Sequence, residues 1–355
     1  MRKHIFNAGP SILNLDVLME ASNAVLELDE LGMSVLEISH RSPEFAHIMN
    51  GAQDMIRQLM GLDDSYHVLF LQGGASMQFC MLPYNLLDSK GSAFYFDTGK
   101  WANNAVKEAK HFGTVNSVSS EDKNYCYIPE RYSLQGNEAY LHYTSNNTIY
   151  GTQVHKIPEV GVPLICDMSS DIFSREMDFS RFDLIYAGAQ KNLGPAGVTI
   201  VILKDSLLGK VDRQIPTMLD YKTHISKNSL FNTPPVFAIY VCYLTLKRLI
   251  EKGGLEDVEK ANDQKAATLY NEIDENPLFV GTANQEDRSK MNVTFKLEDD
   301  SLNELFLNMA NEVGLAGLKG HRSVGGFRAS IYNALPLESV NVLVETMREF
   351  ATVNG

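Results

Sequence analysis

The sequence predicts an α/β fold in which a mostly parallel sheet is covered by helices on both faces. Between residues 67 and 203, short apolar segments of strand length alternate with segments of helical periodicity, which is the pattern of repeated βαβ units. After a long apolar helix, the order changes to helix, strand, helix, strand, helix, which predicts a smaller α+β domain. We therefore expect a large domain over 14–250 and a small domain over 251–355, to which we also assign segment 1–13.

Periodicity, together with glycine and proline at the segment ends, predicts the individual elements. Helical periodicity over 16–31 stops at Gly32, and that over 43–60 stops at Gly61, because glycine is favoured where a helix ends. The long helix at 236–251 has prolines before it and glycines after it, which are good start and stop signals. Strands are expected at 67–72, 92–97, 139–143, 163–166, 184–187, 197–203, 291–297 and 326–332. The remaining helices are expected at 77–87, 100–111, 257–273, 302–313 and 337–350.

Composition limits the classes of function. The 355 residues are 44% hydrophobic and 21% charged, as in ordinary soluble proteins. The longest apolar run, at 236–246, is too short to cross a bilayer, and the N-terminus has no signal-peptide hydrophobic region. Cys80, Cys126, Cys166 and Cys242 form no CxxC pair, which favours reduced thiols in a cytoplasmic protein. The net charge of −13 argues against a nucleic-acid partner or an anionic membrane surface.

One lysine lies in an unusual setting. An apolar strand at 184–187 leads into the loop GAQKNLGPAG, which carries Lys191, and a second apolar strand follows at once. α/β enzymes bind ligands at strand ends, and a lysine that is held in one place and partly desolvated there suits Schiff-base chemistry. A surface lysine on a turn is the alternative, and it would be favoured if Lys191 stood alone.

A carboxylate ends the preceding buried strand. The run PLICD places Asp167 after four apolar or small residues, where an ionised side chain needs a cationic partner. A protonated pyridine nitrogen would be such a partner. Asp167 and Lys191 at neighbouring strand ends are the arrangement that a pyridoxal phosphate site needs. An Asp that caps a helix, with an unrelated lysine, is the alternative.

Two further features fit a planar, phosphorylated cofactor. The turn Gly73-Gly74-Ala75-Ser76 lies between a strand and a helix, where free backbone amides can bind phosphate. A plain turn with Ser76 as the helix N-cap is the alternative. Trp101, the only tryptophan, follows the strand at 92–97 and could stack on a planar ring, although a tryptophan more often packs in the core.

Arginines beside histidine or glycine could bind anionic substrates. The dipeptide His-Arg occurs at His40-Arg41 and at His321-Arg322, and Arg328 lies in the run GGFRAS. A guanidinium group binds carboxylate or phosphate through two oxygens, so these residues could form a cationic site in an otherwise acidic protein. Structural salt bridges are the alternative for each of them.

Five stretches occur in order between residue 4 and the C-terminus: NAGP at 7–10, EISHR at 37–41, AGAQKNLGPAG at 187–197, FNTPP at 231–235 and GHRSVGGFRASIY at 320–332. Together they resemble the phosphoserine aminotransferase family of class V aminotransferases, which are fold-type I pyridoxal phosphate enzymes. The resemblance implies a large domain with a mostly parallel seven-stranded sheet, a smaller C-terminal α+β domain, and a homodimer with an active site shared between its subunits.

The resemblance also implies a reaction. Such an enzyme converts 3-phosphohydroxypyruvate and L-glutamate to O-phospho-L-serine and 2-oxoglutarate in serine biosynthesis, and it could also act on 4-phosphohydroxy-L-threonine in pyridoxine biosynthesis. Its partners are dianionic small molecules, its cofactor is pyridoxal 5′-phosphate, and no metal is expected.

Roles for single residues near the cofactor follow from the resemblance. Lys191 would be the Schiff-base lysine and the acid/base that moves the proton. Asp167 would pair with the pyridine nitrogen, Trp101 would stack on the ring, and Thr148 would hydrogen-bond the ring hydroxyl or its neighbourhood. The phosphate would be held by Ala75, Ser76 and Gln190 of one subunit and by Asn232 and Thr233 of the other.

The resemblance assigns the arginines to the substrate. Arg328 would bind the α-carboxylate, while the distal anion would be bound by His40 and Arg41 together with His321 and Arg322 from the partner subunit. The sequence departs from some family members at Ala8, where they have serine, and at 75–76, where they have Gly-Arg. The second departure removes a cation from the phosphate site.

Rival functions remain open at this point. Within the same fold, the rivals are another aminotransferase or a cysteine desulfurase, and the latter needs a mobile, reactive cysteine. From a different class, the rival is a catalytically silent binding or regulatory protein. The presence of Lys191, Asp167 and the arginines disfavours the silent protein.

Overall fold

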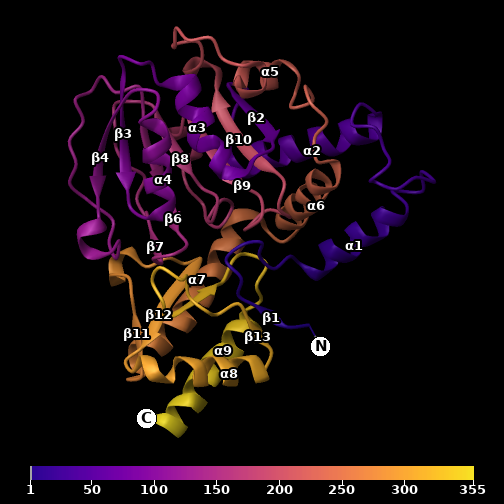
Figure 1. Ribbon diagram of the computed structural model, residues 1–355. Coiled ribbons are helices and arrows are strands. Elements are labelled where there is room, and N and C mark those ends of the chain that lie inside the picture. Colours follow the sequence, from indigo (N-terminus) through magenta and orange to yellow (C-terminus); the bar gives the residue numbers. More distant parts are fainter. Residues whose placement is uncertain (1) are drawn as a thin grey trace.

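A seven-stranded sheet forms the centre of the larger part of the molecule (Figure 1). The computed structural model describes residues 2–355. The strands are β2 (Tyr66–Leu71), β3 (Ser92–Asp97), β4 (Thr114–Ser119), β5 (Leu141–Thr144), β8 (Leu164–Asp167), β9 (Leu184–Gly188) and β10 (Thr199–Lys204). They lie in the order β2-β10-β9-β8-β5-β3-β4. Only β10 is antiparallel to its neighbours, so the predicted mostly parallel, seven-stranded sheet is confirmed.

Helices cover both faces of this sheet. Alternate residues of a strand point to opposite faces, so Val68 and Phe70 pack into one core while Leu69 and Leu71 pack into another. The first core is completed by α1 (Leu15–Leu26), α2 (Pro43–Met60) and α6 (Val236–Glu251), and the second by α3 (Gly74–Leu86), α4 (Lys100–Ala109) and α5 (Tyr221–Ser226). Short 3-10 helices are η1 (Glu121–Lys123), η2 (Phe179–Arg181), η3 (Asp205–Leu207), η4 (Thr217–Leu219), η5 (Gln285–Asp287) and η6 (Asp300–Leu302).

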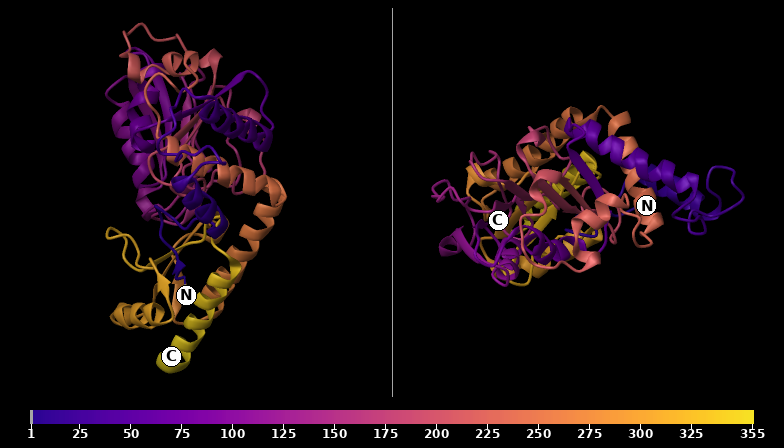
Figure 2. Two further views of the ribbon diagram at one scale, coloured as in Figure 1. Left: turned by 90° about the vertical axis from the view of Figure 1, so that its right-hand side faces the viewer. Right: turned by 90° about the horizontal axis from the view of Figure 1, so that it is seen from above.

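A separate apolar core lies below the strand ends in Figure 1. An antiparallel sheet of order β11-β12-β14 is built from β11 (Phe279–Gly281), β12 (Asn292–Leu297) and β14 (Phe327–Ser330). It packs with α7 (Gly254–Glu275), α8 (Asn303–Glu312) and α9 (Leu337–Asn354), of which α7 and α9 lie side by side (Figure 2).

The N-terminal segment joins this smaller core. Strand β1 (His4–Ile5) pairs in parallel with β13 (Leu315–Ala316), and the buried Phe6 and Ile12 pack among the apolar residues of the smaller core. Helix α7 begins in the larger core, through Leu255, and continues into the smaller one. We therefore propose the division into 14–250 and 251–355 with 1–13, in which α7 spans the junction.

Several predicted boundaries are wrong for identifiable reasons. The helix expected over 16–31 ends at Leu26, because Glu27 is extended and Asp29 and Glu30 have positive φ angles. The strand β4 was not predicted, since its residues, TVNSVS, are polar and partly exposed at the sheet edge. Helix α3 begins at Gly74 rather than at 77, after Gly73 with φ of 92°. None of the helices within residues 2–355 is long and apolar enough to cross a membrane.

A buried lysine ties α7 to the end of β14. Lys265 is 2% exposed, and its Nζ donates hydrogen bonds to the carbonyl oxygens of Ile331 (2.9 Å) and Tyr332 (2.7 Å). No carboxylate of residues 2–355 forms an ion pair with it. Burial lowers the pKa of Lys265 from 10.5 to about 7, because the charged form loses its hydration.

This lysine should make stability depend on pH. Between pH 7 and 10.5 the unfolded chain binds a proton at Lys265 that the folded chain does not, so folding becomes more favourable as pH rises. We expect the free energy of unfolding of the wild type to rise by about 1.4 kcal/mol per pH unit relative to Lys265→Met, measured by urea denaturation between pH 7.5 and 9.5. The exposed Lys260 of the same helix supplies the control: Lys260→Met keeps Lys265 and should therefore show the same pH dependence as the wild type. Parallel pH profiles for the wild type and Lys265→Met would contradict the expectation.

Candidate active site

A cavity of about 310 Å³ lies at the carboxyl ends of β5, β8 and β9. It is lined by Ala8, Gly9, Gly74, Ala75, Ser76, Phe79, Trp101, Thr144, Asn146, Thr148, Ile149, Asp167, Ser169, Ser170, Gln190, Lys191, His321 and Arg328. Nine of the predicted site residues are in this list. These nine residues come from the end of β8, the loop after β9, two helices, a hairpin and the smaller domain, which is the type of junction where ligand sites occur.

Asp167 and Lys191 lie at the ends of adjacent parallel strands, as predicted. Asp167 is buried, and its Oδ1 accepts a hydrogen bond from the Ser169 amide (2.9 Å). Burial raises the pKa of Asp167, while the contacts with Ser169 and the Lys191 charge oppose the rise. Burial lowers the pKa of Lys191, which the Asp167 carboxylate opposes and the nearby Arg328 reinforces. A lowered pKa favours the neutral amine, which suits a lysine that acts as nucleophile and proton carrier.

The first turn of α3 offers a phosphate site. Because the helix begins at Gly74, the amides of Gly74, Ala75 and Ser76 precede the first intrahelical bond, from Met77 to Gly73. Such amides favour anions. The helix N-cap is Gly73, which has no side-chain cap, so the alternative that Ser76 caps this helix is wrong. Gln190 lines the same cavity from the opposite loop.

Trp101 lies at the cavity and not in the core. It is 37% exposed, and its indole Nε1 donates to Thr148 Oγ1 at 3.2 Å. Arg328 Nη1 donates to the backbone oxygen of Thr148 at 3.1 Å, while Arg328 Nε is buried without a partner among residues 2–355. Thr148 thus connects the predicted stacking residue to the predicted carboxylate-binding residue.

A short hairpin holds Thr148 in place. Strands β6 (Asn146–Asn147) and β7 (Thr152–Gln153) flank it, and the hairpin packs against β12, where Thr294 Oγ1 donates to the Tyr150 carbonyl (3.1 Å). Gly151 has φ of 73°, and a Cβ at this position would overlap Thr294 Oγ1. The close approach of hairpin and strand therefore requires glycine.

His321 lines this cavity in its own chain, whereas the resemblance implies that it acts from the partner subunit. Its Nδ1 is hydrogen-bonded to Ser323 Oγ (2.7 Å). Partial burial and the charges of Arg328, Arg322 and Lys100 lower the pKa of His321, because several cations converge at the cavity mouth. Such a mouth favours anionic ligands.

Five predicted residues lie outside the cavity within one chain. They are His40, Arg41, Asn232, Thr233 and Arg322. Arg41, Asn232, Thr233 and Arg322 are exposed, and the Thr233 carbonyl accepts a hydrogen bond from Gln72 Nε2 (2.9 Å). The roles of Asn232, Thr233 and Arg322 across a subunit interface, and those of His40 and Arg41 at the distal anion, stay predictions.

Some cavity residues were not predicted. Thr144, Asn146, Ser169 and Ser170 are buried polar residues at the ends of β5 and β8. The sequence does contain a signal for these residues, because they end or follow apolar strands, as Asp167 does. Phe79 gives no such signal, because it is apolar on a helix that also packs in the core.

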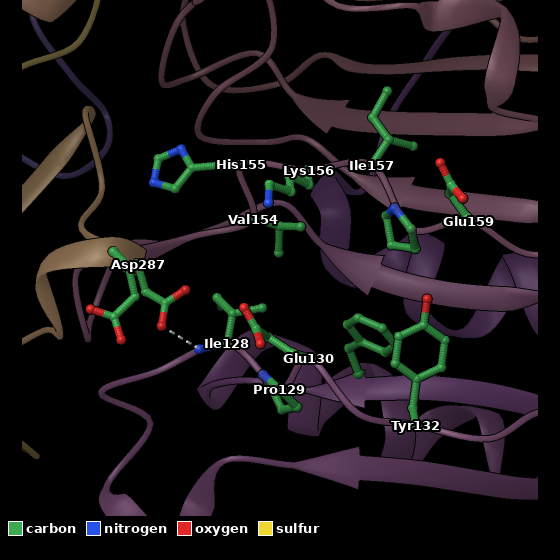
Figure 3. Close-up of a pocket in the computed structure, with 13 residues that line it drawn as sticks. Ile128, Pro129, Glu130, Tyr132, Val154, His155, Lys156, Ile157, Glu159 and Asp287 are labelled. Atoms are coloured by element: carbon green, nitrogen blue, oxygen red, sulfur yellow. Dashed lines mark hydrogen bonds between the residues drawn. The ribbon is translucent and has the colours of Figure 1, made fainter.

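A larger hollow lies elsewhere and contains none of the predicted residues. Its volume is about 430 Å³, and it lies between the segments at 128–132 and 154–159 and the short helix η5 (Figure 3). Ile128, Tyr132 and Val154 are among its lining residues, and the Ile128 amide donates to Asp287 Oδ2 (3.1 Å). Size alone therefore does not identify the active site; the chemistry of the lining does.

Comparison with known proteins gives consistent matches. A family model described as aminotransferase class-V matches residues 4–343. The chain is 56% identical to a phosphoserine aminotransferase of Flavobacterium psychrophilum over 351 residues, 98% of this chain and 99% of that protein. Among solved structures, the phosphoserine aminotransferase from Bacillus circulans subsp. alkalophilus has a TM-score of 0.97 at 47% identity, covering 100% of this chain and 99% of that one. A structure from Trichomonas vaginalis, described as a PLP-bound phosphoserine aminotransferase, has a TM-score of 0.93 at 37% identity, covering 98% and 100% of the two chains.

The glycine at the hairpin can be tested against a matched glycine. Gly151 and the exposed Gly136 both have positive φ, but a Cβ on Gly136 would meet nothing within 4 Å. Both alanine variants should carry the backbone strain, whereas Gly151→Ala should lose about 1–3 kcal/mol more from overpacking, measured by urea denaturation. Because the hairpin carries Thr148, Gly151→Ala should also bind pyridoxal phosphate more weakly. Equal losses of stability in the two variants would show that the contact with Thr294 is not tight.

Proposed function

This chain belongs to the class-V aminotransferase family, and we propose that it transfers the amino group of L-glutamate to 3-phosphohydroxypyruvate, which yields O-phospho-L-serine and 2-oxoglutarate in serine biosynthesis. The observation that carries the proposal is the meeting of Lys191, Asp167 and the amide-rich start of α3 at one cavity. The named relatives, at more than half identity over nearly the whole chain, supply the substrate class.

The cavity fits pyridoxal phosphate, the cofactor of this family. The free amides of the α3 start and the Ser76 hydroxyl suit its phosphate, the buried Asp167 carboxylate suits a protonated ring nitrogen, and Trp101 suits a ring face. When bound, the cofactor supplies an aldehyde that takes up the amino group and a ring that withdraws electrons from the substrate carbon. We propose these roles for Ser76, Asp167 and Trp101.

The side chains of the protein then control the proton and the orientation. Lys191 Nζ is the group that carries the proton, because burial lowers its pKa and so favours the neutral amine that can accept one. Asp167 keeps its charge when it faces a cation, since an opposite charge offsets the cost of its burial. Arg328 holds the substrate α-carboxylate with its guanidinium, which lies at the cavity next to Thr148.

The distal anion of the substrate is bound at the cavity mouth. His321 lies there within the chain, and we propose that His40, Arg41 and Arg322 complete the site when two copies associate as a homodimer. Helix α1 and the loop after it project from the body (Figure 2). They expose apolar side chains, namely Leu15, Leu18, Met19, Leu26, Leu31, Met33 and Leu36. An exposed apolar surface of this kind supports a protein partner.

The desulfurase alternative lacks a cysteine in the right place. No cysteine is among the residues that line the cavity, and Cys166 and Cys242 are buried. Burial raises the pKa of the Cys166 and Cys242 thiols, which makes them poor nucleophiles. All four thiols are free, and we propose a cytoplasmic location on that basis.

A half-reaction screen tests the substrate class. Protein loaded with pyridoxal phosphate is mixed with single amino acids, and the absorbance of the bound cofactor is followed. O-phospho-L-serine and L-glutamate should convert it rapidly, and L-alanine and L-aspartate slowly; 4-phosphohydroxy-L-threonine is a further arm. Lys191→Ala should slow the response by about 10²- to 10⁴-fold. A rapid response to alanine without one to phosphoserine would overturn the proposal.

The distal-anion site can be tested at Arg41. Arg41→Ala should raise the KM for both glutamate and the phosphorylated substrate by about 10- to 100-fold, because a charge-assisted hydrogen bond is worth about 1.5–3 kcal/mol. The absorbance of the bound cofactor should not change. Arg57→Ala, on the adjacent helix α2, removes a half-buried arginine paired with the exposed Asp54 and serves as the control. Loss of cofactor from Arg41→Ala would show that Arg41 has a different role.

A further inference from the structure

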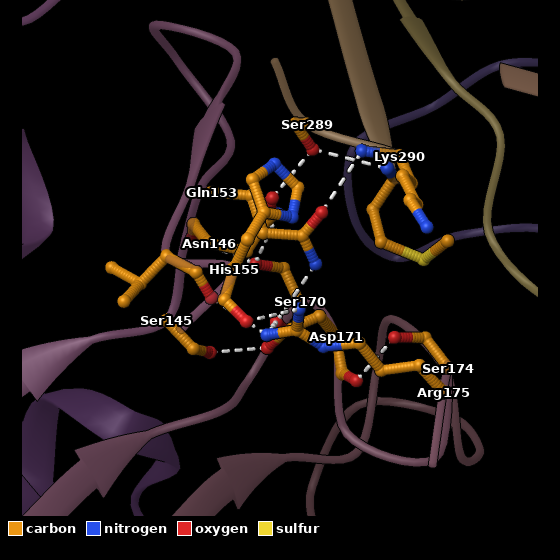
Figure 4. A network of polar contacts seen from close by, with 12 residues as sticks. Ser145, Asn146, Gln153, His155, Ser170, Asp171, Ser174, Arg175, Ser289 and Lys290 are labelled. Carbon is orange, nitrogen blue, oxygen red and sulfur yellow. Dashed lines mark hydrogen bonds and ion pairs between the residues drawn. The ribbon is translucent and has the colours of Figure 1, made fainter. Parts of the chain in front are cut away.

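A chain of buried side-chain hydrogen bonds joins the turn after β8 to the start of β12. Figure 4 shows the part of it around Asn146, Ser170 and Ser289. Its centre is Asn146, whose Nδ2 donates to Ser170 Oγ (2.8 Å) and to Asn292 Oδ1 (2.7 Å). The Ser289 hydroxyl donates to Asn146 Oδ1. All four residues are at most 2% exposed, so water cannot replace a lost partner and each bond matters for the geometry.

The chain continues to the strand that carries Arg328. Asn292 Nδ2 donates to Ser330 Oγ (2.9 Å) and to the Tyr332 hydroxyl (3.1 Å). Asn292 lies opposite Ser330 in the pairing of β12 with β14, two residues along the strand from Arg328. The Tyr332 hydroxyl donates in turn to the carbonyl of Ala8, which lines the cavity (2.8 Å). Burial raises the pKa of Tyr332 to about 12, so this donor keeps its proton at neutral pH.

At its other end the chain reaches the cofactor side of the cavity. Ser170 belongs to the turn in which the Ser169 amide binds the Asp167 carboxylate. The Ser169 hydroxyl accepts a hydrogen bond from the Gly188 amide (3.1 Å), at the end of the strand that leads to Lys191. The same chain of contacts therefore connects Asp167 and Lys191 to Arg328.

A second link, also visible in Figure 4, runs beside the first. Asp171 accepts a hydrogen bond from Gln153 Nε2 (3.1 Å), and Gln153 Oε1 accepts one from the Lys290 amide (3.0 Å). Segment 289–292 is thus held at two points against the larger domain. The position of β12 relative to the cavity is therefore fixed by contacts with the larger domain, in addition to the strand pairing within its own sheet.

The hydrogen bonds at the centre of this chain require the side-chain amides of two asparagines. Asn146 and Asn292 each use both amide hydrogens and the amide oxygen, and the one accepts from the other. An aspartate at 292 has no donor for Ser330 and Tyr332, although it has nearly the same shape as asparagine. This difference allows an almost isosteric test.

We propose that Asn292 is a positioning residue that acts through Asn146 and Ser330 to set the distance between the Arg328 guanidinium and the Asp167–Lys191 pair. The consequence is that Asn292 determines how well the α-carboxylate is held while the amino group lies at the reacting carbon. The proposal rests on the function proposed above. Asn292 does not line the cavity, so it influences substrate binding only through its neighbours.

The chain offers a matched control. Asn262 on α7 is equally buried and also bridges the two parts of the molecule, since its Nδ2 donates to the Ser174 carbonyl (2.9 Å) and to Asn333 Oδ1 (2.9 Å). Neither Asn262 nor its two partners line the cavity. Asn262→Asp therefore weakens the domain junction by a comparable chemical change without touching the path from Asp167 to Arg328.

The test compares Asn292→Asp with Asn262→Asp. Asn292→Asp should raise the KM for glutamate and phosphoserine by at least about tenfold, while the dissociation constant for pyridoxal phosphate and the absorbance of the bound cofactor change less than about twofold. Amide hydrogen exchange at 327–330 should be faster in Asn292→Asp only. If Asn292→Asp does not fold, Asn292→Ser keeps a donor at the position and should show the same pattern at smaller size.

Each other outcome has a definite meaning. Equal KM changes in the two variants would overturn the proposal, because they would reflect a general loosening of the junction. Loss of cofactor from Asn292→Asp would also overturn it, since the cofactor side should stay intact. If the wild-type protein does not transaminate phosphoserine, the proposed function is contradicted, but the role of Asn292 is not. In that case, hydrogen exchange at 327–330 still decides whether Asn292 positions the Arg328 strand.

Discussion

The structure depends on one electrostatic constraint, which is that a buried carboxylate, Asp167, and a half-buried amine, Lys191, lie at the ends of adjacent parallel strands. Asp167 and Lys191 are close enough to influence one another's pKa, yet neither forms a direct ion pair within residues 2–355. Burial moves both groups toward their neutral forms, and each charge partly restores the other. Such a pair is costly for the fold. In the proposed function, a protonated pyridine ring would supply the cation that offsets the buried charge of Asp167.

Polar groups from several parts of the chain lie around the pair. The Asp167 carboxylate is bound by the Ser169 amide, and the Ser11 hydroxyl donates to the Lys191 carbonyl. The helix start after Gly73 adds free amides, and the hairpin at 146–153 adds Thr148. Because these groups lie on separate elements, the site exists only when the larger domain, the smaller domain and the N-terminal segment are all in place.

Local sequence was sufficient for the parts of the site that depend on strand ends. Apolar runs that terminate in Asp167 and before Lys191 predicted both positions, and the glycines before α3 predicted a phosphate site, although the helix starts three residues earlier than expected. The polar hairpin at 146–153 was missed, since its two short strands have no apolar periodicity. Nor does local sequence show that Trp101 avoids the core, because its environment is set by Thr148, which lies 47 residues away.

The hydrogen bonds between the larger and the smaller domain were the least predictable feature, for a physical reason. Asn146 and Asn292 are 146 residues apart, and a buried asparagine has the same local sequence signature as an exposed one in a turn. Their contact arises because β12 pairs with β14 and the hairpin packs on β12 through Gly151. Arg328 thus takes its position from β-sheet register and Asp167 from a strand end. The side-chain amides of Asn146 and Asn292 connect the strand of Arg328 to the turn after Asp167. The geometry of the site is therefore a property of the junction between the two domains and not of either domain alone.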